Sequence, residues 1–294
     1  MNTEQALMVL LSNPVLDEIG LKRIEHILKH SIDWYKVFYI SLIEKTTFFI
    51  YKNLLQYHYF WSVPNCLISI WETAYWGNTK RNKKLLYYDN ILHHIFSCKG
   101  ITTISGSGIM LLNSVYHNML GVRQLHDIDF FTQKSFLSDI DIIMHNLDFK
   151  KLYINDSDLF SYTTIPNEYS ILYSKFVDSM FINCDFCSHI TEYPTLYPVL
   201  FKYLKNKKTP EYYFSQLIIL YISALKSWDG TYYINDIKHY SYSKLIDIHL
   251  YKRKYAHSMP QNLLKEIKNI SNISETMQDV DKCLTFFEKE GYLT

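Results

Sequence analysis

Apolar residues recur at helical spacing through the first part of the chain. Between residues 16 and about 59 they follow a period of three to four positions, which predicts two or three helices. Pro64 and its polar neighbours interrupt this pattern, and a longer helical stretch then extends to about residue 98. Lys99 and Gly100 predict its end, because a cation in the last turn and a glycine after it stabilise a helix C-terminus. The apolar stripe of this long stretch consists of Leu85, Tyr88, Ile91, Leu92, Ile95 and Phe96.

From residue 101 the pattern becomes one of short strands that alternate with helices. Residues 101–104 are β-prone, 105–108 predict a tight turn, and a helix is expected from Ile109 to about Met119, closed by Gly121. Residues 127–131 alternate carboxylates with apolar side chains, as in a half-buried strand. We expect Ser135 to cap the next helix, which carries Phe136, Ile140, Met144 and Leu147. Further strands are predicted at roughly 149–154, 169–175 and 180–187, with a loop at 155–167.

The helical period returns after Pro194. Helices are predicted at 214–227, 242–251, 261–270 and 275–290. The expected fold is therefore α+β. A small mixed sheet with helices at 99–193 is flanked by an N-terminal helical region at 1–98 and a C-terminal helical region at 194–294. The sequence shows neither an internal repeat nor a long linker, so we expect these regions to pack as one unit.

Composition is that of a globular protein without a strong charge. The 294 residues are 48% hydrophobic, and 30 Lys and Arg against 29 Asp and Glu give a formal net charge of +1. Broad electrostatic attraction to nucleic acid is therefore not expected. The apolar run at 6–11 has no cationic segment before it, which argues against a signal peptide, and no stretch reaches the roughly 18 apolar residues of a membrane helix. These features predict a cytoplasmic protein with no membrane association.

Cysteines and tyrosines offer weaker signals. The five cysteines include a CxxC at Cys184 and Cys187, but on a strand these two thiols point to opposite faces, so a zinc or redox role is not favoured. Four tyrosines in the C-terminal half occur in adjacent pairs and could stack on a base, although half-buried aromatic packing is the simpler interpretation. They are Tyr212, Tyr213, Tyr232 and Tyr233.

The sharpest chemical signal is the pair of aspartates in Asp127-Ile128-Asp129. Residues two apart on a strand point to the same face, about 6–7 Å apart. Two carboxylates this close repel each other, and the usual remedy is a shared proton or a divalent cation bound by oxygen. The pair therefore indicates metal binding, while the alternative is an edge strand with a solvated acidic face.

Two further features give that pair a context. Gly106 and Ser107 lie between a predicted strand and the first turn of a helix, where free backbone N–H groups and the helix dipole favour a phosphate. Asp185, among the apolar residues of a later strand, is the best candidate for a third carboxylate that binds a metal and accepts a proton. The structural alternatives are a harmless helix cap for the turn and a strand-end aspartate that caps a turn.

These motifs, in this order, resemble a known family. The residues that carry the likeness between 82 and 131 are Asn82, Leu85, Leu86, Ile91, Leu92, Gly100, Ile101, Gly106, Ser107, Arg123, Asp127, Ile128 and Asp129. The segment is similar to the uncharacterised nucleotidyltransferase family of the polymerase-β-like nucleotidyltransferase superfamily, and 183–186 resembles the later strand of that family, which carries its third aspartate. The resemblance implies a polymerase-β-like core that binds ATP or another NTP with two Mg²⁺ ions, or alternatively Mn²⁺.

The chain departs from the family pattern at two places. Ser105-Gly106-Ser107 stands where the family tends to have Lys-Gly, and Cys187 stands where the family often has a histidine two residues past the third aspartate, with His189 two residues further on.

Three basic residues are candidates for contact with the nucleotide. Arg123 could pair with a phosphate or with Asp127, or else form a surface salt bridge. Lys226 and Lys244 lie in the C-terminal helical region, where relatives place groups that face the nucleotide; lysines on helices are otherwise solvated.

The sequence thus predicts an enzyme that transfers a nucleoside monophosphate from an NTP to a hydroxyl-type acceptor and releases pyrophosphate. Asp127, Asp129 and Asp185 are the expected metal ligands and catalytic residues, and Gly106, Ser107, Arg123, Lys226 and Lys244 are the expected nucleotide ligands. The family resemblance implies a small-molecule or peptide acceptor, or alternatively a tRNA or protein acceptor, as in toxin–antitoxin systems. A different class of function is a nucleotidyltransferase fold that has lost catalysis and serves as a binding or scaffold protein.

Overall fold

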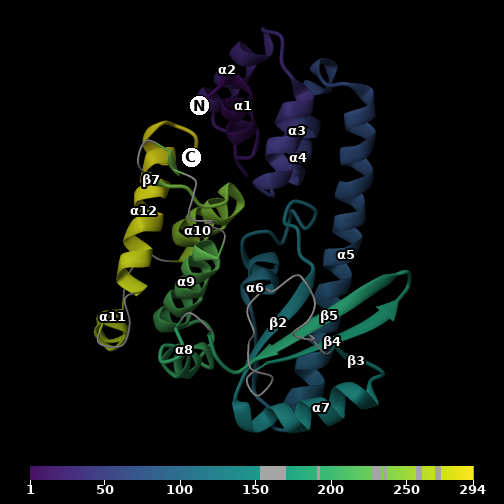
Figure 1. The fold of residues 1–294 in the computed structure, drawn as a ribbon, viewed down its shortest axis with the longest axis vertical. Helices are drawn as coiled ribbons and strands as arrows, with labels where there is room; N and C mark the ends of the chain where they lie inside the picture. The colour runs from purple at the N-terminus through teal and green to yellow at the C-terminus, as the bar shows by residue number, and fades with distance from the viewer. Residues whose placement is uncertain are drawn as a thin grey trace.

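The computed structural model of the protein describes residues 1–152, 170–190, 193–226, 233–234, 237–255, 260–268 and 273–293. Within them the fold is α+β, with a small mixed sheet of five strands and many helices (Figure 1). The expected loop at 155–167 and the tyrosine at position 232 lie outside the described residues. Among the described helices, none is both long and apolar enough to cross a membrane.

Four short helices form the N-terminal region: α1 (Thr3–Leu11), α2 (Glu18–Leu28), α3 (Trp34–Ile43) and α4 (Thr47–Gln56), followed by the 3₁₀ turn η1 (Tyr59–Ser62). The prediction of two or three helices between residues 16 and 59 is confirmed. The sequence pattern missed α1, whose residues from Leu7 to Leu11 are all buried. A helix buried on all sides has no polar stripe, so its period cannot be seen in the sequence.

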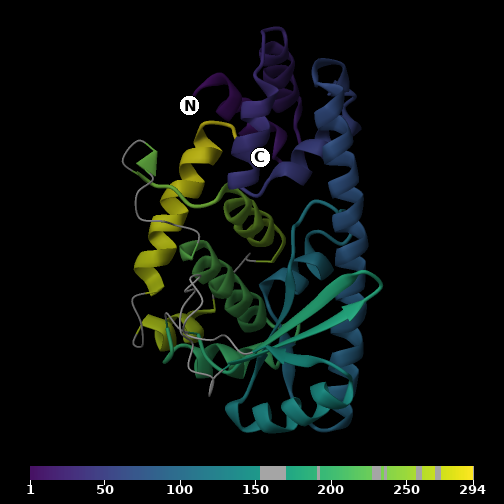
Figure 2. The ribbon, with the colours of Figure 1, turned by 45° about the vertical axis from the view of Figure 1, so that its right-hand side comes forward.

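Helix α5 (Asn65–Cys98) spans 34 residues, or about 51 Å, and lies along one side of the molecule in both views (Figures 1 and 2). It ends as predicted, with Gly100 at a φ of 71°, a conformation that glycine adopts without strain. Its C-terminal half packs against the sheet, where the Phe96 ring meets Phe130 and Phe186 at 6.3 and 5.5 Å between centroids. The helix therefore forms the back wall of the sheet.

The sheet consists of β1 (Thr103–Ser105), β2 (Asp127–Thr132), β3 (Lys150–Leu152), β4 (Ser170–Val177) and β5 (Met180–Cys187). Its spatial order is β1-β2-β5-β4-β3, with β2 and β5 parallel and the other neighbours antiparallel. The prediction of a mixed sheet is confirmed. The parallel pair places the two aspartate-bearing strands side by side at its centre.

Two helix boundaries in this region were predicted wrongly. Helix α6 (Ser107–Ser114) begins at Ser107 and ends seven residues before Gly121. The chain beyond it is held by α5 instead, because the Asn78 side chain donates hydrogen bonds to the carbonyls of Gly121 and Arg123 at 2.8 and 3.1 Å. Ser135 does not cap the next helix: it lies within the 3₁₀ turn η2 (Lys134–Phe136), and α7 (Leu137–Asn146) starts after it.

The C-terminal region contains α8 (Tyr197–Leu204), α9 (Pro210–Leu225), α10 (Tyr242–Tyr255), α11 (Gln261–Lys268), α12 (Ile273–Lys289) and the short hairpin of β6 (Tyr233–Ile234) and β7 (Ile237–Lys238). The four predicted helices are confirmed, whereas α8 and the hairpin were missed. Helices α9 and α10 lie side by side between α12 and the sheet (Figures 1 and 2). Glu44 accepts the backbone N–H of Tyr242 at 2.7 Å, which joins the N-terminal region to the start of α10.

Candidate active site

Three carboxylates meet on one face of the sheet because of the register between β2 and β5. Asp129 lies directly across from Asp185, and Asp127 lies across from Asn183. Neighbouring strands are about 4.8 Å apart, and residues two apart on a strand share a face. Asp127, Asp129 and Asp185 therefore project from adjacent strands to the same side.

The opposite face of the same two strands is apolar and closed. Ile128 and Phe130 on β2 alternate with the aspartates and are fully buried, as are Cys184 and Phe186 on β5. The rings of Phe130 and Phe186 stack at 4.8 Å. Because α5 covers this face, the carboxylates on the other face point away from the core formed with α5.

The Gly106 turn lies against the second aspartate. The Gly106 N–H donates to the Asp129 carbonyl at 2.7 Å, and a Cβ at position 106 would stand 2.5 Å from the Asp129 Cβ. Glycine is thus required for contact between the turn and the strand. Gly106 is also the N-cap of α6 and provides no side-chain cap, so the first turn of α6 begins next to Asp129 without a side chain bonded to its N–H groups.

Burial is the main cause that raises the pKa of each of the three carboxylates. Burial, followed by the charges of Asp127 and Asp185, raises the pKa of Asp129 to about 7. Burial raises the pKa of Asp185 to about 6, and a hydrogen bond from the Cys187 thiol opposes that shift. Burial also raises the pKa of Asp127. A bound cation would stabilise the ionised form of these clustered carboxyl groups.

Two of the predicted lysines lie near this cluster. Lys244 on α10 and Lys226 at the C-terminal end of α9 both oppose the rise in the pKa of Asp129. Lys244 itself is desolvated, which lowers its pKa to about 8, and its Nζ donates to the Ser223 hydroxyl at 2.5 Å. The C-terminal helices therefore bring positive charge to the carboxylate face.

Arg123 forms a buried ion pair, whereas one alternative from the sequence was a salt bridge at the surface. Its side chain is buried, and its Nη2 pairs with Asp247 Oδ2 on α10 at 2.9 Å. Tyr116 donates to the other oxygen of Asp247 at 2.7 Å. The surface alternative is wrong because the loop that carries Arg123 packs between α5 and α10. This arginine joins that loop to the C-terminal region.

The carboxylates would need further ligands to hold a divalent cation. Within the described part of the chain, no three His, Cys, Asp or Glu side chains form a cluster that could hold a metal ion by themselves. A nucleotide-bound Mg²⁺ does not require one, because it is held by one or two carboxylates, water and the phosphates. Among the same residues, Oδ1 of Asp185 is buried without a hydrogen-bond partner, as expected of an oxygen that awaits a ligand or a proton.

Sequence reasoning missed two cations near the start of β2. After burial, the charges of Arg81 and Lys45 lower the pKa of His126, the residue before Asp127. Lys45 also acts on Lys244. It follows the α3 helix with a φ of 56°, in the left-handed region. Neither residue belongs to a local motif. They lie near β2 only because α3 and α5 pack close to that strand in the folded protein.

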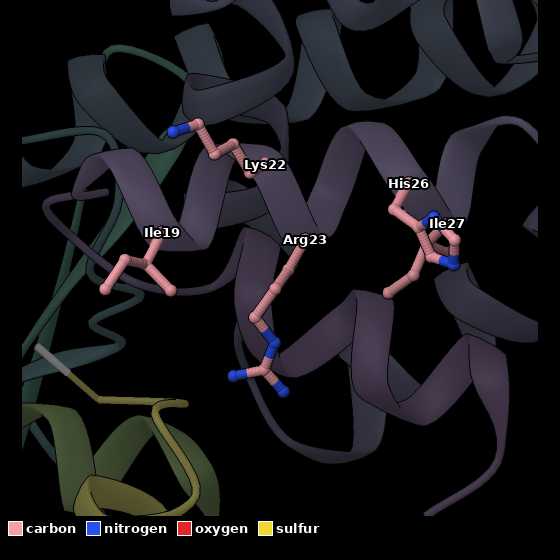
Figure 3. Close-up of a pocket in the computed structure, with 5 residues that line it drawn as sticks. All are labelled: Ile19, Lys22, Arg23, His26 and Ile27. Carbon is pink, nitrogen blue, oxygen red and sulfur yellow. The ribbon is translucent and has the colours of Figure 1, made fainter.

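The CxxC and a surface pocket contribute nothing to this centre. Cys184 faces the core and Cys187 the carboxylate face, so the prediction that the thiols diverge is confirmed. A shallow pocket of about 330 Å³ on α2 is lined by the residues drawn in Figure 3: Ile19, Lys22, Arg23, His26 and Ile27. Its arginine is already engaged, since Nη1 of Arg23 donates to the Glu290 and Gly291 carbonyls at 2.9 Å.

Comparison with known proteins adds no relative: no protein-family profile, no curated protein and no solved structure matches this chain.

Proposed function

We propose that this chain is a Mg²⁺-dependent nucleotidyltransferase. It would transfer a nucleoside monophosphate from ATP or another NTP to a hydroxyl-type acceptor and release pyrophosphate. The observation that carries the proposal is the register of Asp129 with Asp185, with Asp127 on the same face and the Gly106 turn in contact with Asp129. This arrangement supports the polymerase-β-like resemblance of the sequence.

In this proposal Asp127, Asp129 and Asp185 hold the divalent ions, which when bound neutralise phosphate charge and make the acceptor hydroxyl more acidic. The backbone N–H groups at Ser107 donate to the β- and γ-phosphates, since a helix N-terminus is a favourable site for an anion. Lys244 and Lys226 add positive charge from the helical side. Positioning and electrostatics therefore supply most of the catalysis.

Asp185 has the clearest role in proton transfer. Its buried Oδ1, which has no partner among the described residues, accepts the proton of the acceptor hydroxyl. The acceptor oxygen then forms a bond to the α-phosphorus, and the bond from that phosphorus to the pyrophosphate oxygen breaks. The electron pair leaves with pyrophosphate.

The acceptor we favour is a small molecule or a peptide. A formal net charge of +1 provides no general attraction for a long nucleic acid, although tRNA or a protein remains an alternative acceptor. The test is an assay with each of the four α-labelled NTPs, in which the label is followed to small molecules and to macromolecules.

Asp127→Asn and Asp129→Asn should each abolish label transfer, whereas Asp139→Asn, which changes an exposed acid on α7, should leave it intact. Equal transfer by wild type and the two site variants would defeat the proposal. Absence of Mg²⁺–NTP binding by wild type in calorimetry would favour the rival function, a binding or scaffold protein that has kept the fold without catalysis.

A further inference from the structure

A cavity of about 360 Å³ lies at the open edge of strand β1, apart from the carboxylate face. Its walls come from α5, β1, α6, the α8–α9 connection, the first turn of α9 and the C-terminal end of α10. Four tyrosines line it, including the pair Tyr212 and Tyr213 that the sequence marked as able to stack on a base. Such a volume and such a mixed lining are typical of small-ligand sites.

The aromatic wall of the cavity contains stacked tyrosine rings. The rings of Tyr213 and Tyr255 stack at 4.6 Å with an interplanar angle of 10°, and Tyr251 lies 4.9 Å from Tyr255. Tyr213 and Tyr255 are only partly buried, so part of each ring can still meet a ligand. Stacked tyrosines of this kind are surfaces for another planar ring.

The polar part of the cavity is a hydrogen-bonded group on α5 and β1. The Ser105 hydroxyl donates to Asp89 Oδ1 at 2.8 Å, so His93 Nε2, at 2.7 Å from the same hydroxyl, must be the donor in that contact. Burial lowers the pKa of His93 to about 4, so its imidazole is neutral near pH 7. With the proton on Nε2, Nδ1 accepts from the Thr103 hydroxyl at 2.7 Å.

Asp89 is consequently the negative group of this cavity. It is 2% exposed, and burial raises its pKa to about 6 despite the Ser105 hydrogen bond and the charge of Lys207. Its carboxylate has a second oxygen that accepts hydrogen bonds but donates none when ionised. A ligand group that meets Asp89 should therefore be a hydrogen-bond donor, such as an amino group.

Two exposed lysines complete the lining. Lys207 and Lys208 lie in the connection between α8 and α9 and contribute the positive charge of this cavity. One ligand thus meets tyrosine rings, a buried hydrogen-bond acceptor and an external pair of cations. In a nucleotide, the base matches the tyrosine rings, an amino group on the base matches the acceptor, and the phosphate matches the cations.

We propose that this cavity binds a nucleotide whose base carries an exocyclic amino group, with that group on Asp89, the base against the tyrosines and the phosphate at Lys207 and Lys208. Adenine and cytosine present an amino donor where uracil presents a carbonyl oxygen. A carbonyl oxygen opposite the buried carboxylate would leave both acceptors without a donor. The cavity should therefore prefer AMP to UMP.

This site is separate from the proposed catalytic centre. Along α10, Lys244 at the carboxylate face and Tyr255 at the cavity are 11 residues apart, which corresponds to about 16 Å. Ser105 pairs with Phe130 in the sheet, so its side chain lies on the α5 side, opposite the aspartates. Binding in the cavity requires neither the carboxylates nor a divalent ion.

The test is calorimetric titration of the full chain with AMP, UMP and inorganic phosphate in the presence of EDTA. AMP should bind at least tenfold more tightly than UMP, and Asp129→Asn should not change either affinity. The double substitution Lys207→Ala with Lys208→Ala, at exposed positions that leave the core intact, should weaken AMP binding at least tenfold. Asp89→Asn should reduce the preference for AMP, because an amide can face the ligand with either its oxygen or its NH₂ group.

Several outcomes would overturn the inference: no AMP binding at millimolar concentration, equal affinity for AMP and UMP, or unchanged AMP binding in the double lysine variant. Loss of AMP binding in Asp129→Asn would assign the binding to the carboxylate face instead. Because the titration contains no divalent ion, failure of the proposed catalytic function would leave its result unaffected.

Discussion

Gly106→Ala is the substitution that most sharply tests the contact between the turn and β2. The added Cβ would stand 2.5 Å from the Asp129 Cβ, whereas ordinary contacts begin at 3.4 Å, so the two backbones must separate by about 0.9 Å. Strand β2 cannot yield easily, because β1 pairs with it on one side and β5 on the other. We expect a loss of about 1–3 kcal/mol in the free energy of unfolding, as in overpacked cores.

The effect on function should exceed the effect on stability. A displacement near 1 Å in a positioning element costs roughly 100-fold in rate, so Gly106→Ala should reduce label transfer from an α-labelled NTP by about that factor while the protein stays folded. Gly77→Ala is the matched control: it lies within α5, its new Cβ meets nothing within 4 Å, and it should raise stability by about 1 kcal/mol without changing transfer.

Urea unfolding and the transfer assay together give the answer. If Gly106→Ala retained wild-type transfer and wild-type stability, the close approach of the turn to Asp129 would be refuted.

Other substitutions test the buried charges. Arg123→Met should cost about 3–5 kcal/mol in urea unfolding, because it removes the cation that pairs with the buried Asp247 carboxylate; a loss below about 1 kcal/mol would contradict that role. The pKa of His93 is about 4 in the folded state, below its ordinary 6.5. Between pH 4 and 6.5 the folded state therefore binds fewer protons than the unfolded state, and His93 makes the free energy of unfolding rise with pH. Asp89, at about 6 instead of 3.8, acts in the opposite direction, and the two effects largely cancel in wild type. Asp89→Asn should therefore show a stability increase of about 3 kcal/mol between pH 4 and 6.5, and a flat profile would contradict the assignment.

Local periodicity was sufficient to predict most elements and the faces of the central strands. The alternation in Asp127-Ile128-Asp129 sets both aspartates on one face because the strand repeat is two residues, whatever the neighbours. The end of α5 at Gly100 was likewise a local property. The sequence predicted Asp185 only as a third carboxylate on another strand, and its register with Asp129 was not predicted, since strand pairing across more than 50 residues leaves no local pattern.

The parts that sequence reasoning missed depend on tertiary contacts. Asp89 and His93 are four residues apart on α5, and from the sequence alone they look like residues of a solvent-exposed helix face. In the folded protein β1 places the Ser105 hydroxyl in contact with both of them. The loop after α6 is held by Asn78 of α5, whose side chain donates a hydrogen bond to the Gly121 carbonyl. The partner of Arg123 is Asp247, 124 positions away along the chain, so no local pattern could identify it.

The central claim is that three aspartates from two strands bind divalent cations with an NTP. Its most direct test is electron paramagnetic resonance titration of Mn²⁺ in the presence of a non-hydrolysable NTP analogue. Wild type and Asp139→Asn should bind Mn²⁺ with the same affinity, and Asp129→Asn and Asp185→Asn should each weaken binding at least tenfold. Equal Mn²⁺ affinity in all four proteins would contradict the account.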